Sequence, residues 1–415
     1  MNTQISPTLN MKDLTDAAAR VFSRAEVDTA MTSGFVETGA RGAFLTTHNG
    51  DKILDCVTGA SMFTLGRNHP EIRAALVRAA QETDQGNFVT VSEEKARLAK
   101  RLSQFMPPPL SCFLFTVVRG EAMDAACKLA RGRTGRSRLL TVDRGYYGDT
   151  GFALSLSDLA ARNRFGRLIP DTGVIGFNAP EDLSRVDTSC AAVILEPVQT
   201  ESGLRKANPD WLDALRRRCD HTGTLLITDE TQTGFGRTGS KFAGDAFGIK
   251  PDIMVFGEAV TGGMFPMTGI AFTPEVKIFF DEHPLIHLCT FGGHDVGCRT
   301  AMAALDIYDR DTPWENALIQ GNKILDALQT QVDNLPEIAS VSGWGLLLGI
   351  RFTDPAAAEC FLGGAAAEKI YAACARFARG TVLLRPALTL TDTETETLIS
   401  GLVHACKKIS HSEAT

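Results

Sequence analysis

The sequence predicts an α/β protein with a mainly parallel sheet in a large domain and a smaller α+β unit near the C-terminus. Three observations support this fold class. Strand-like apolar runs alternate with helical patterns from about residue 70 to residue 310, one helix carries clear start and stop signals, and acidic residues directly follow an apolar run. The chain has 415 residues, 44% of them hydrophobic and 22% charged, which suits a globular protein with a sizeable core.

The first predicted elements are two helices, followed by the first strands of the sheet. Apolar residues at i, i+4 spacing after Pro70 indicate one helix, and the apolar stripe from Leu98 to Leu102 indicates a second. The next expected elements are a strand over 112–118, a helix over 122–131, and strands over 139–142 and 192–196. This alternation is typical of a parallel sheet with helices on its faces.

The helix that follows has the clearest start and stop signals in the chain. Asn208 can cap it, Pro209 suits its first turn, and Gly223 can end it. Two further buried strands are expected over 224–228 and 253–256. These elements complete the predicted large sheet.

The predicted organisation has three segments. Residues 1–60 are expected to be an N-terminal segment of the small domain, residues 61–315 the large domain with the functional site, and residues 316–415 the C-terminal small domain. The residues at 391–394 have the form of a capping box, so we expect a final helix after them.

Composition and charge exclude several classes of function. The net charge of -7 argues against a general nucleic-acid binder, which needs a basic face. No run of about 18 uncharged apolar residues predicts a membrane helix, and the first twenty residues lack the pattern of a secretory signal. The ten cysteines form no CxxC pair, so we expect reduced thiols in a cytoplasmic protein without a metal site.

The candidate site lies at the end of a predicted strand. Asp229 directly follows an apolar strand, and open parallel sheets bind ligands beyond the carboxyl ends of their strands. A carboxylate there needs a cation or a hydrogen-bond donor if it is buried, although a single Asp can also simply cap a loop. The neighbouring string DETQTGFGRTG over 229–239 is unusually specific.

That string resembles the class III (ornithine, GABA and ω-amino acid) aminotransferases, which use pyridoxal phosphate on a fold type I scaffold. Five other segments also resemble motifs of this family, and they occur in the family's order along the chain: 65–70, 128–131, 146–150, 196–199 and 290–291. The resemblance covers nearly the whole chain. It implies the fold type I architecture, a homodimer whose site needs both subunits, and pyridoxal or pyridoxamine phosphate as cofactor.

The resemblance also implies roles for six residues around the cofactor and the substrate. Asp229 would pair with the protonated ring nitrogen, Gln232 with the phenolic oxygen, Tyr146 with the ring face and Thr290 with the partner's phosphate, while Glu196 would order the pocket and Arg385 would hold a substrate carboxylate. Two simpler interpretations remain open at this stage. Tyr146 can be an ordinary core aromatic, and Arg385 can be a solvated arginine.

The pattern breaks at the residue expected to hold the cofactor covalently. The flanks around 251–263 match the family without a gap, and Glu258 stands at the position of the family's lysine. A carboxylate cannot form a Schiff base. We expect Glu258 to lie near Asp229 with a raised pKa, either as a general acid or base or as a structural anchor.

A second break lies at the predicted phosphate cradle. The family has small residues before the helix at 122–131, whereas this chain has Val118 and Arg119 before Gly120. We assign Arg119 and Gly120 to the cofactor pocket, where Arg119 either donates to phosphate or fills the cofactor's place.

The sequence therefore predicts an aminotransferase-derived enzyme with an atypical site, in which Glu258 and Asp229 are the catalytic candidates. Its substrate would be a small amino- or carboxyl-bearing metabolite. Pyridoxal or pyridoxamine phosphate would be bound without a covalent link, or not at all. Two alternatives stay open: a conventional enzyme carrying a Lys-to-Glu substitution that traps an intermediate, and a non-catalytic dimeric scaffold.

Overall fold

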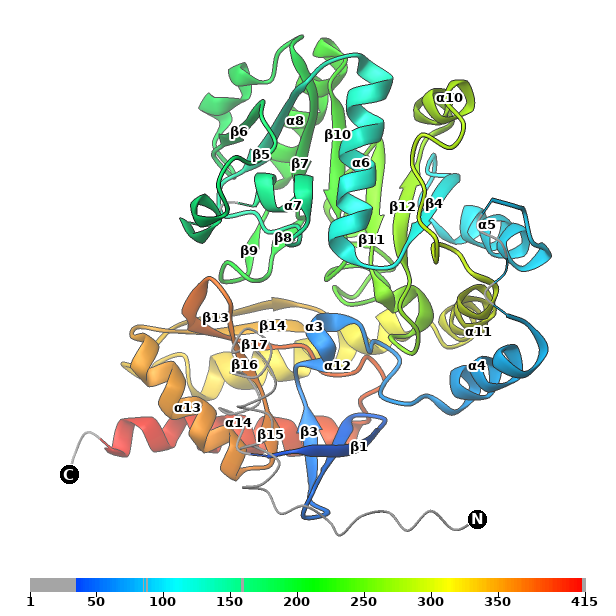
Figure 1. Ribbon diagram of the computed structural model, residues 1–415. Helices are drawn as coiled ribbons and strands as arrows, with labels where there is room; N and C mark the ends of the chain where they lie inside the picture. Colours follow the sequence, from blue (N-terminus) through cyan, green and yellow to red (C-terminus); the bar gives the residue numbers. More distant parts are fainter. Residues whose placement is uncertain (1–34, 85, 87–88, 158–159, 413–415) are drawn as a thin grey trace.

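The large domain is built on a seven-stranded sheet with helices on both faces (Figure 1). This computed structural model describes residues 35–412 except 85, 87–88 and 158–159. The strand order is β4 (Cys112–Thr116), β12 (Thr268–Phe272), β11 (Ile253–Phe256), β10 (Leu225–Asp229), β7 (Cys190–Leu195), β5 (Arg138–Val142) and β6 (Thr172–Ile175). Strands β11, β10, β7, β5 and β6 are parallel to one another, and β12 runs antiparallel to both of its neighbours. The predicted fold class is confirmed.

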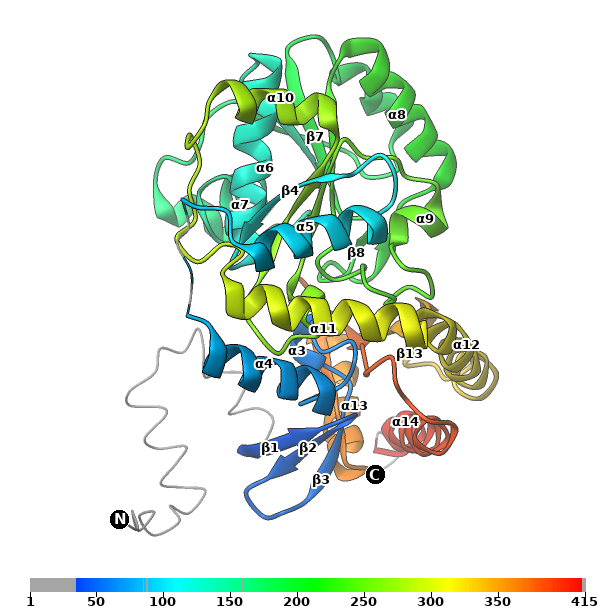
Figure 2. The ribbon, with the colours of Figure 1, turned by 90° about the vertical axis from the view of Figure 1, so that its right-hand side faces the viewer.

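The two faces of the sheet alternate along each strand, because successive side chains point to opposite sides. In β10, Ile227 packs in a cluster with helix α6 (Arg119–Thr134), while Leu226 packs with α8 (Pro209–Thr222). Figure 2 shows α6 and α8 on opposite sides of the sheet. The sheet is therefore buried on both faces, which explains why its strands are apolar throughout.

The predicted start and stop signals of α8 are confirmed. The side chain of Asn208 accepts from the backbone amides of Asp210 and Trp211, Pro209 lies in the first turn, and Gly223 ends the helix in the left-handed region. The five predicted strands agree with the structure to within about two residues. Helix α6 starts at Arg119 rather than at residue 122 as predicted, because the chain is extended only as far as Val118.

Further elements occupy the rest of the chain between residues 58 and 311. They are α3 (Thr58–Ser61), α4 (Pro70–Glu82), α5 (Glu93–Phe105), α7 (Gly151–Leu156), α9 (Ala243–Phe247), α10 (Pro274–Glu282), α11 (Asp295–Asp311), the strands β8 (Val198–Gln199) and β9 (Arg205–Lys206), and the 3-10 turns η1 (Ala160–Phe165), η2 (Pro180–Arg185) and η3 (Glu258–Thr261). Helices α5 and α11 pack with β11 and β12 in a separate apolar cluster of the large domain.

The small domain is built from two segments that are far apart in the sequence. One sheet contains β1 (Glu37–Arg41), β2 (Phe44–Thr47), β3 (Lys52–Asp55) and β15 (Ile370–Tyr371), and the other contains β13 (Ile338–Trp344), β14 (Leu347–Phe352), β17 (Ala378–Leu384) and β16 (Ala373–Ala375). Strand β15 pairs in parallel with β3. The N-terminal segment thus shares a sheet with the C-terminal part, and the bounds predicted for the domains stay a prediction.

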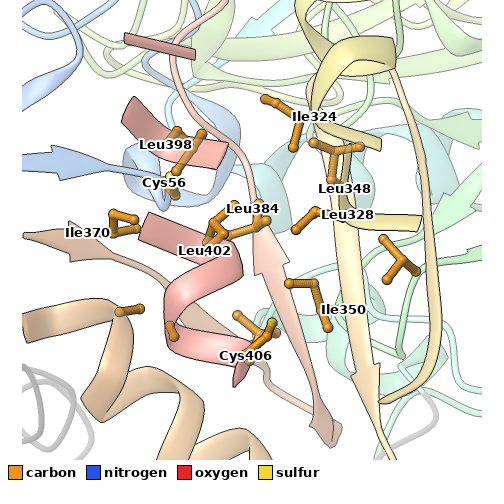
Figure 3. Close-up of a cluster of buried hydrophobic side chains, with 14 of the residues drawn as sticks. Cys56, Ile324, Leu328, Leu348, Ile350, Ile370, Leu384, Leu398, Leu402 and Cys406 are labelled. Carbon is orange, nitrogen blue, oxygen red and sulfur yellow. The ribbon is translucent and has the colours of Figure 1, made fainter. Parts of the chain in front are cut away.

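Three helices complete the small domain and enclose its core. They are α12 (Pro313–Gln331), α13 (Pro355–Ala367) and α14 (Asp392–Ser412). Figure 3 shows Ile324, Leu328, Leu402 and their neighbours converging between these helices and the sheets. The predicted capping box is present, since Thr391 and Glu394 exchange hydrogen bonds of 2.8 and 3.2 Å between side chain and backbone amide. Within the described residues, no helix has both the length and the hydrophobicity needed to cross a bilayer.

Candidate active site

A cavity of about 1230 Å³ lies at the carboxyl ends of β10 and β11. The large domain contributes Arg119, Tyr146, Gln232 and Glu258 to its lining, and the two ends of the chain contribute residues between 35 and 62 and between 359 and 379. This is the edge at which open parallel sheets bind ligands. The small domain therefore completes a site that the sheet begins.

Arg119 is the central cation of this site. It is the first residue of α6, and its side chain is only 13% exposed. Its Nε donates to Asp229 Oδ2 at 2.8 Å, and its Nη2 donates to Glu196 Oε1 at 2.9 Å and to the backbone oxygen of Tyr146 at 2.5 Å. Burial alone would lower the pKa of Arg119, but the carboxylates of Asp229 and Glu196 outweigh that effect and raise it. The guanidinium is therefore permanently charged.

Both carboxylate oxygens of Asp229 are engaged within the chain. Oδ2 accepts from Arg119, while Oδ1 accepts from the backbone amide of Thr231 at 3.0 Å and from its hydroxyl at 2.6 Å. Asp229 itself is 2% exposed. The cation that this buried carboxylate requires is supplied by Arg119, and the loop-capping bond to Thr231 is present as well.

The ring of Tyr146 lies against the same guanidinium. The Cζ atom of Arg119 lies 5.0 Å from the centre of the Tyr146 ring, and the Phe377 ring lies at 5.4 Å. The Tyr146 hydroxyl donates to Asp149 at 2.9 Å and accepts from Arg376 at 2.9 Å. Tyr146 is half-buried at the cavity wall, so it is not an ordinary core aromatic.

Glu196 holds the other side of Arg119. Its second carboxylate oxygen accepts from the backbone amide of Tyr146 at 3.1 Å. Burial raises the pKa of Glu196 to about 7, with Asp229 adding to this effect and Arg119 opposing it. Glu196 is 3% exposed, so Arg119 separates two almost fully buried carboxylates.

Glu258 stands two residues beyond β11 and lines the cavity. Burial raises the pKa of its carboxyl group, Asp229 acts in the same direction, and Arg119 and the residue's own backbone amide act against it. No other described residue donates a hydrogen bond to its carboxylate. A half-buried carboxyl group of this kind can exchange a proton with a molecule in the cavity.

Gln232 and Arg385 belong to a second polar cluster. Arg385 Nη1 donates to Glu201 Oε1 at 2.8 Å and to Gln232 Oε1 at 2.9 Å. Gln232 and Glu201 line the cavity, whereas Arg385 lies behind them and is 3% exposed. The interpretation of Arg385 as a solvated arginine is wrong. Burial alone would raise the pKa of Glu201, but Arg385 and the backbone amide of Arg376 lower it overall.

Two residues of the predicted site do not meet the others. Thr290 is exposed and lies outside the cavity lining. Gly120 is buried in the first turns of α6, where a Cβ atom would lie 2.6 Å from the hydroxyl oxygen of Thr150. Gly120 therefore has a packing role, because the helix approaches this loop too closely for a side chain.

The residues do not fit the cofactor that the resemblance implies. Asp229 was expected to pair with a ring nitrogen, but its oxygens are taken by Arg119 and Thr231. Tyr146 was expected to stack on the ring, but Arg119 lies over it. Glu258 cannot form a covalent link through a Schiff base.

Sequence reasoning missed three residues around the cavity. Glu201 lies two residues beyond the segment 196–199, and Thr231 lies inside the string 229–239, but neither residue was given a role. Arg376 lies on the turn between β16 and β17 and reaches Tyr146 from the small domain. No local signal identifies Arg376, because its partner is 230 residues away in the chain.

Comparison with known proteins gives a consistent result. The family model described as aminotransferase class-III matches residues 25–406. An uncharacterized aminotransferase of Archaeoglobus fulgidus is 35% identical over 344 residues, which cover 83% of this chain and 80% of that protein. The putrescine aminotransferase of Pectobacterium atrosepticum is 30% identical over 401 residues, covering 93% and 86%.

Solved structures share the fold over almost the whole chain. Ornithine aminotransferase from Toxoplasma gondii matches with a TM-score of 0.92 at 22% identity, covering 99% of this chain and 97% of that one. That structure is described as having partial occupancy of pyridoxal phosphate at its active site. An (S)-enantioselective omega-transaminase from Thermomicrobium roseum matches with a TM-score of 0.88 at 25% identity, covering 97% and 99%.

Proposed function

The chain belongs to the class III aminotransferase family, and from this premise we propose that it is an aminotransferase-derived enzyme that works without a lysine-bound cofactor. Its substrate would be a small amino- or carboxyl-bearing metabolite. One observation carries the proposal: a carboxyl group, that of Glu258, lines the cavity directly beyond β11, where the resemblance expects the lysine amine.

Glu258 is the proposed general acid or base. Its raised pKa brings the carboxyl group closer to neutral pH, where it can both hold and release a proton. A positioned acid or base of this kind typically contributes about 10²–10⁴-fold to the rate. Glu258 can turn toward a bound molecule at little cost, because no other described residue donates a hydrogen bond to its carboxylate.

Arg119 and the Glu201–Arg385 pair are the proposed substrate-binding groups. Among the described residues, none accepts a hydrogen bond from Arg119 Nη1, and Arg119 lines the cavity, so this nitrogen can donate to a substrate carboxylate. Glu201 faces the same cavity and can accept from a substrate amine. Arg385 would contact a substrate only if Glu201 or Gln232 moved aside, since both lie in front of it.

We also propose a cytoplasmic homodimer. Four large apolar side chains near Thr290 are 52–62% exposed: Leu285, Ile286, Leu288 and Phe291. Several exposed large apolar side chains within one short segment can mark an interface. All ten cysteines are free thiols, which supports a reducing compartment.

The proposed function is tested by replacing Glu258. The full-length protein is incubated with amino acids, diamines and oxo-acids, and the products are followed by mass spectrometry. Glu258→Gln keeps the shape and removes the titration, so turnover should fall by about 10²–10⁴-fold. Glu359→Gln is the matched control, because Glu359 lines the same cavity but its side chain is 68% exposed.

Three results would contradict the proposal. A folded Glu258→Gln protein with full turnover would remove Glu258 from the reaction. A lysine labelled with a pyridoxyl group after borohydride treatment of the wild-type protein would show that a covalent cofactor link exists after all. If Glu258→Lys turns the protein yellow and confers transamination, a conventional enzyme with a trapping substitution becomes the better description.

A further inference from the structure

Arg119 makes the contacts that a ring cofactor would need from this pocket. Its Nε–H group donates a hydrogen bond to Asp229, and its positive charge offsets the negative charges of Asp229 and Glu196. Its flat face lies over the Tyr146 ring. We propose that Arg119 is a built-in cation in the place of a pyridinium ring, so that this chain excludes pyridoxal and pyridoxamine phosphate even as non-covalent ligands. The inference builds on the proposed function, which removes only the covalent link.

A guanidinium can replace a pyridinium ring in these contacts because the two groups share three properties. Both are planar cations with delocalised charge, both donate an N–H bond to a carboxylate in their own plane, and both offer a face to an aromatic ring. The 2.8 Å bond to Asp229 and the 5.0 Å distance to the Tyr146 ring use the in-plane edge and the face of Arg119.

The position of Arg119 in the fold keeps it there. It is the first residue of α6, a helix of 16 residues that packs against the sheet, so the backbone cannot move away alone. The next residue, Gly120, is held against Thr150. If the side chain left, Asp229 and Glu196 would remain buried as neighbouring carboxylates without their cation. A cofactor would therefore have to replace every bond that Arg119 makes.

The test measures binding of pyridoxamine 5′-phosphate to the purified full-length protein by isothermal titration calorimetry and by near-ultraviolet absorbance. The wild-type protein should show no saturable binding up to about millimolar concentration. Arg119→Gly opens the place beside Asp229 and should bind the probe at least about 100-fold more tightly. Arg119→Gly combined with Asp229→Asn should lose this gain, because the carboxylate partner is gone.

Arg376→Gly is the matched control. Arg376 also lies over the Tyr146 ring, at 5.1 Å, but has no contact with Asp229, so its removal should not create binding. Guanidinium ion added to Arg119→Gly should restore thermal stability and compete with the probe. This rescue also shows whether the variant is folded.

Saturable one-to-one binding of the probe to the wild-type protein at micromolar concentration would overturn the inference. So would a folded Arg119→Gly protein that binds no better than the wild-type protein. A failure of the inference about Arg119 can be distinguished from a failure of the proposed function. The probe measures cofactor binding in the presence of Glu258, whereas the Glu258→Gln experiment measures turnover in the presence of Arg119.

Discussion

Replacing Arg119 by alanine should lower the free energy of unfolding by about 3–5 kcal/mol at pH 8. Asp229 and Glu196 are 2% and 3% exposed in the wild-type protein, and the variant removes the cation that lies between them. Breaking a buried pair costs more than the pair contributes, because the remaining charge has lost its solvation and its partner. Here two carboxylates are left, so the cost should fall in the upper part of that range.

The loss should depend on pH in a definite direction. Burial raises the pKa of Glu196 to about 7 in the wild-type protein, above the value of about 4.3 expected for an unfolded chain. Folding therefore takes up a proton, and stability falls as the pH rises toward 7 and then levels off. Without Arg119 the folded pKa lies higher still. The loss in free energy of unfolding of the variant, relative to the wild-type protein, should then grow above pH 7 by up to about 1.4 kcal/mol per pH unit.

Urea unfolding followed by circular dichroism at pH 6, 7 and 8, at one fixed protein concentration, measures both effects. Arg376→Ala is the control, because Arg376 and Asp149 are 53% and 58% exposed and such a pair contributes about 0–1 kcal/mol. If Arg119→Ala costs no more than the control, or if its deficit does not change with pH, Arg119 does not neutralise buried carboxylates and the interpretation of the site is refuted.

Three further predictions follow from the site, the surface and a helix cap. Glu258→Gln should flatten the pH–rate profile as well as reduce turnover, because the raised pKa of Glu258 would set one limb of the profile. Leu285→Asp together with Phe291→Asp should shift the mass measured by light scattering from dimer to monomer, whereas Ile319→Asp, at an equally exposed apolar position on α12, should not. Asn208→Ala should cost about 1 kcal/mol in thermal or urea unfolding, because two amides of α8 lose their acceptor.

Most of the large sheet could be predicted because its signals are local. Buried parallel strands appear as short apolar runs, and the helix between Asn208 and Gly223 carries its own caps. The antiparallel strand β12 was not predicted, since its direction depends on pairing with β4, which lies far away in the sequence. The pairing of β3 with β15 is equally non-local.

The candidate site could be predicted only in part for the same reason. Asp229 was found because it lies at the end of a strand, which is a local feature, whereas Glu258 was found because it stands at the position of the family's lysine. The sequence left two roles open for Arg119, as a phosphate donor or as an occupant of the cofactor's place. Only the fold brings it to Asp229, which is 110 residues away in the chain. The roles of Gln232, Thr290 and Arg385 toward a cofactor or substrate remain predictions.

The parallel pairing of β3 with β15 also has a consequence for synthesis on the ribosome. Leu54 and Asp55 pair with Ile370 and Tyr371, which are translated more than three hundred residues later. The first strands of the small domain therefore lack β15 as a partner while the whole seven-stranded sheet is synthesised and can fold as a unit. Ile53 and Ile370 both line the cavity. The pocket is thus completed only after residue 370 has been translated, so a shorter nascent chain can contain the folded sheet without a completed site.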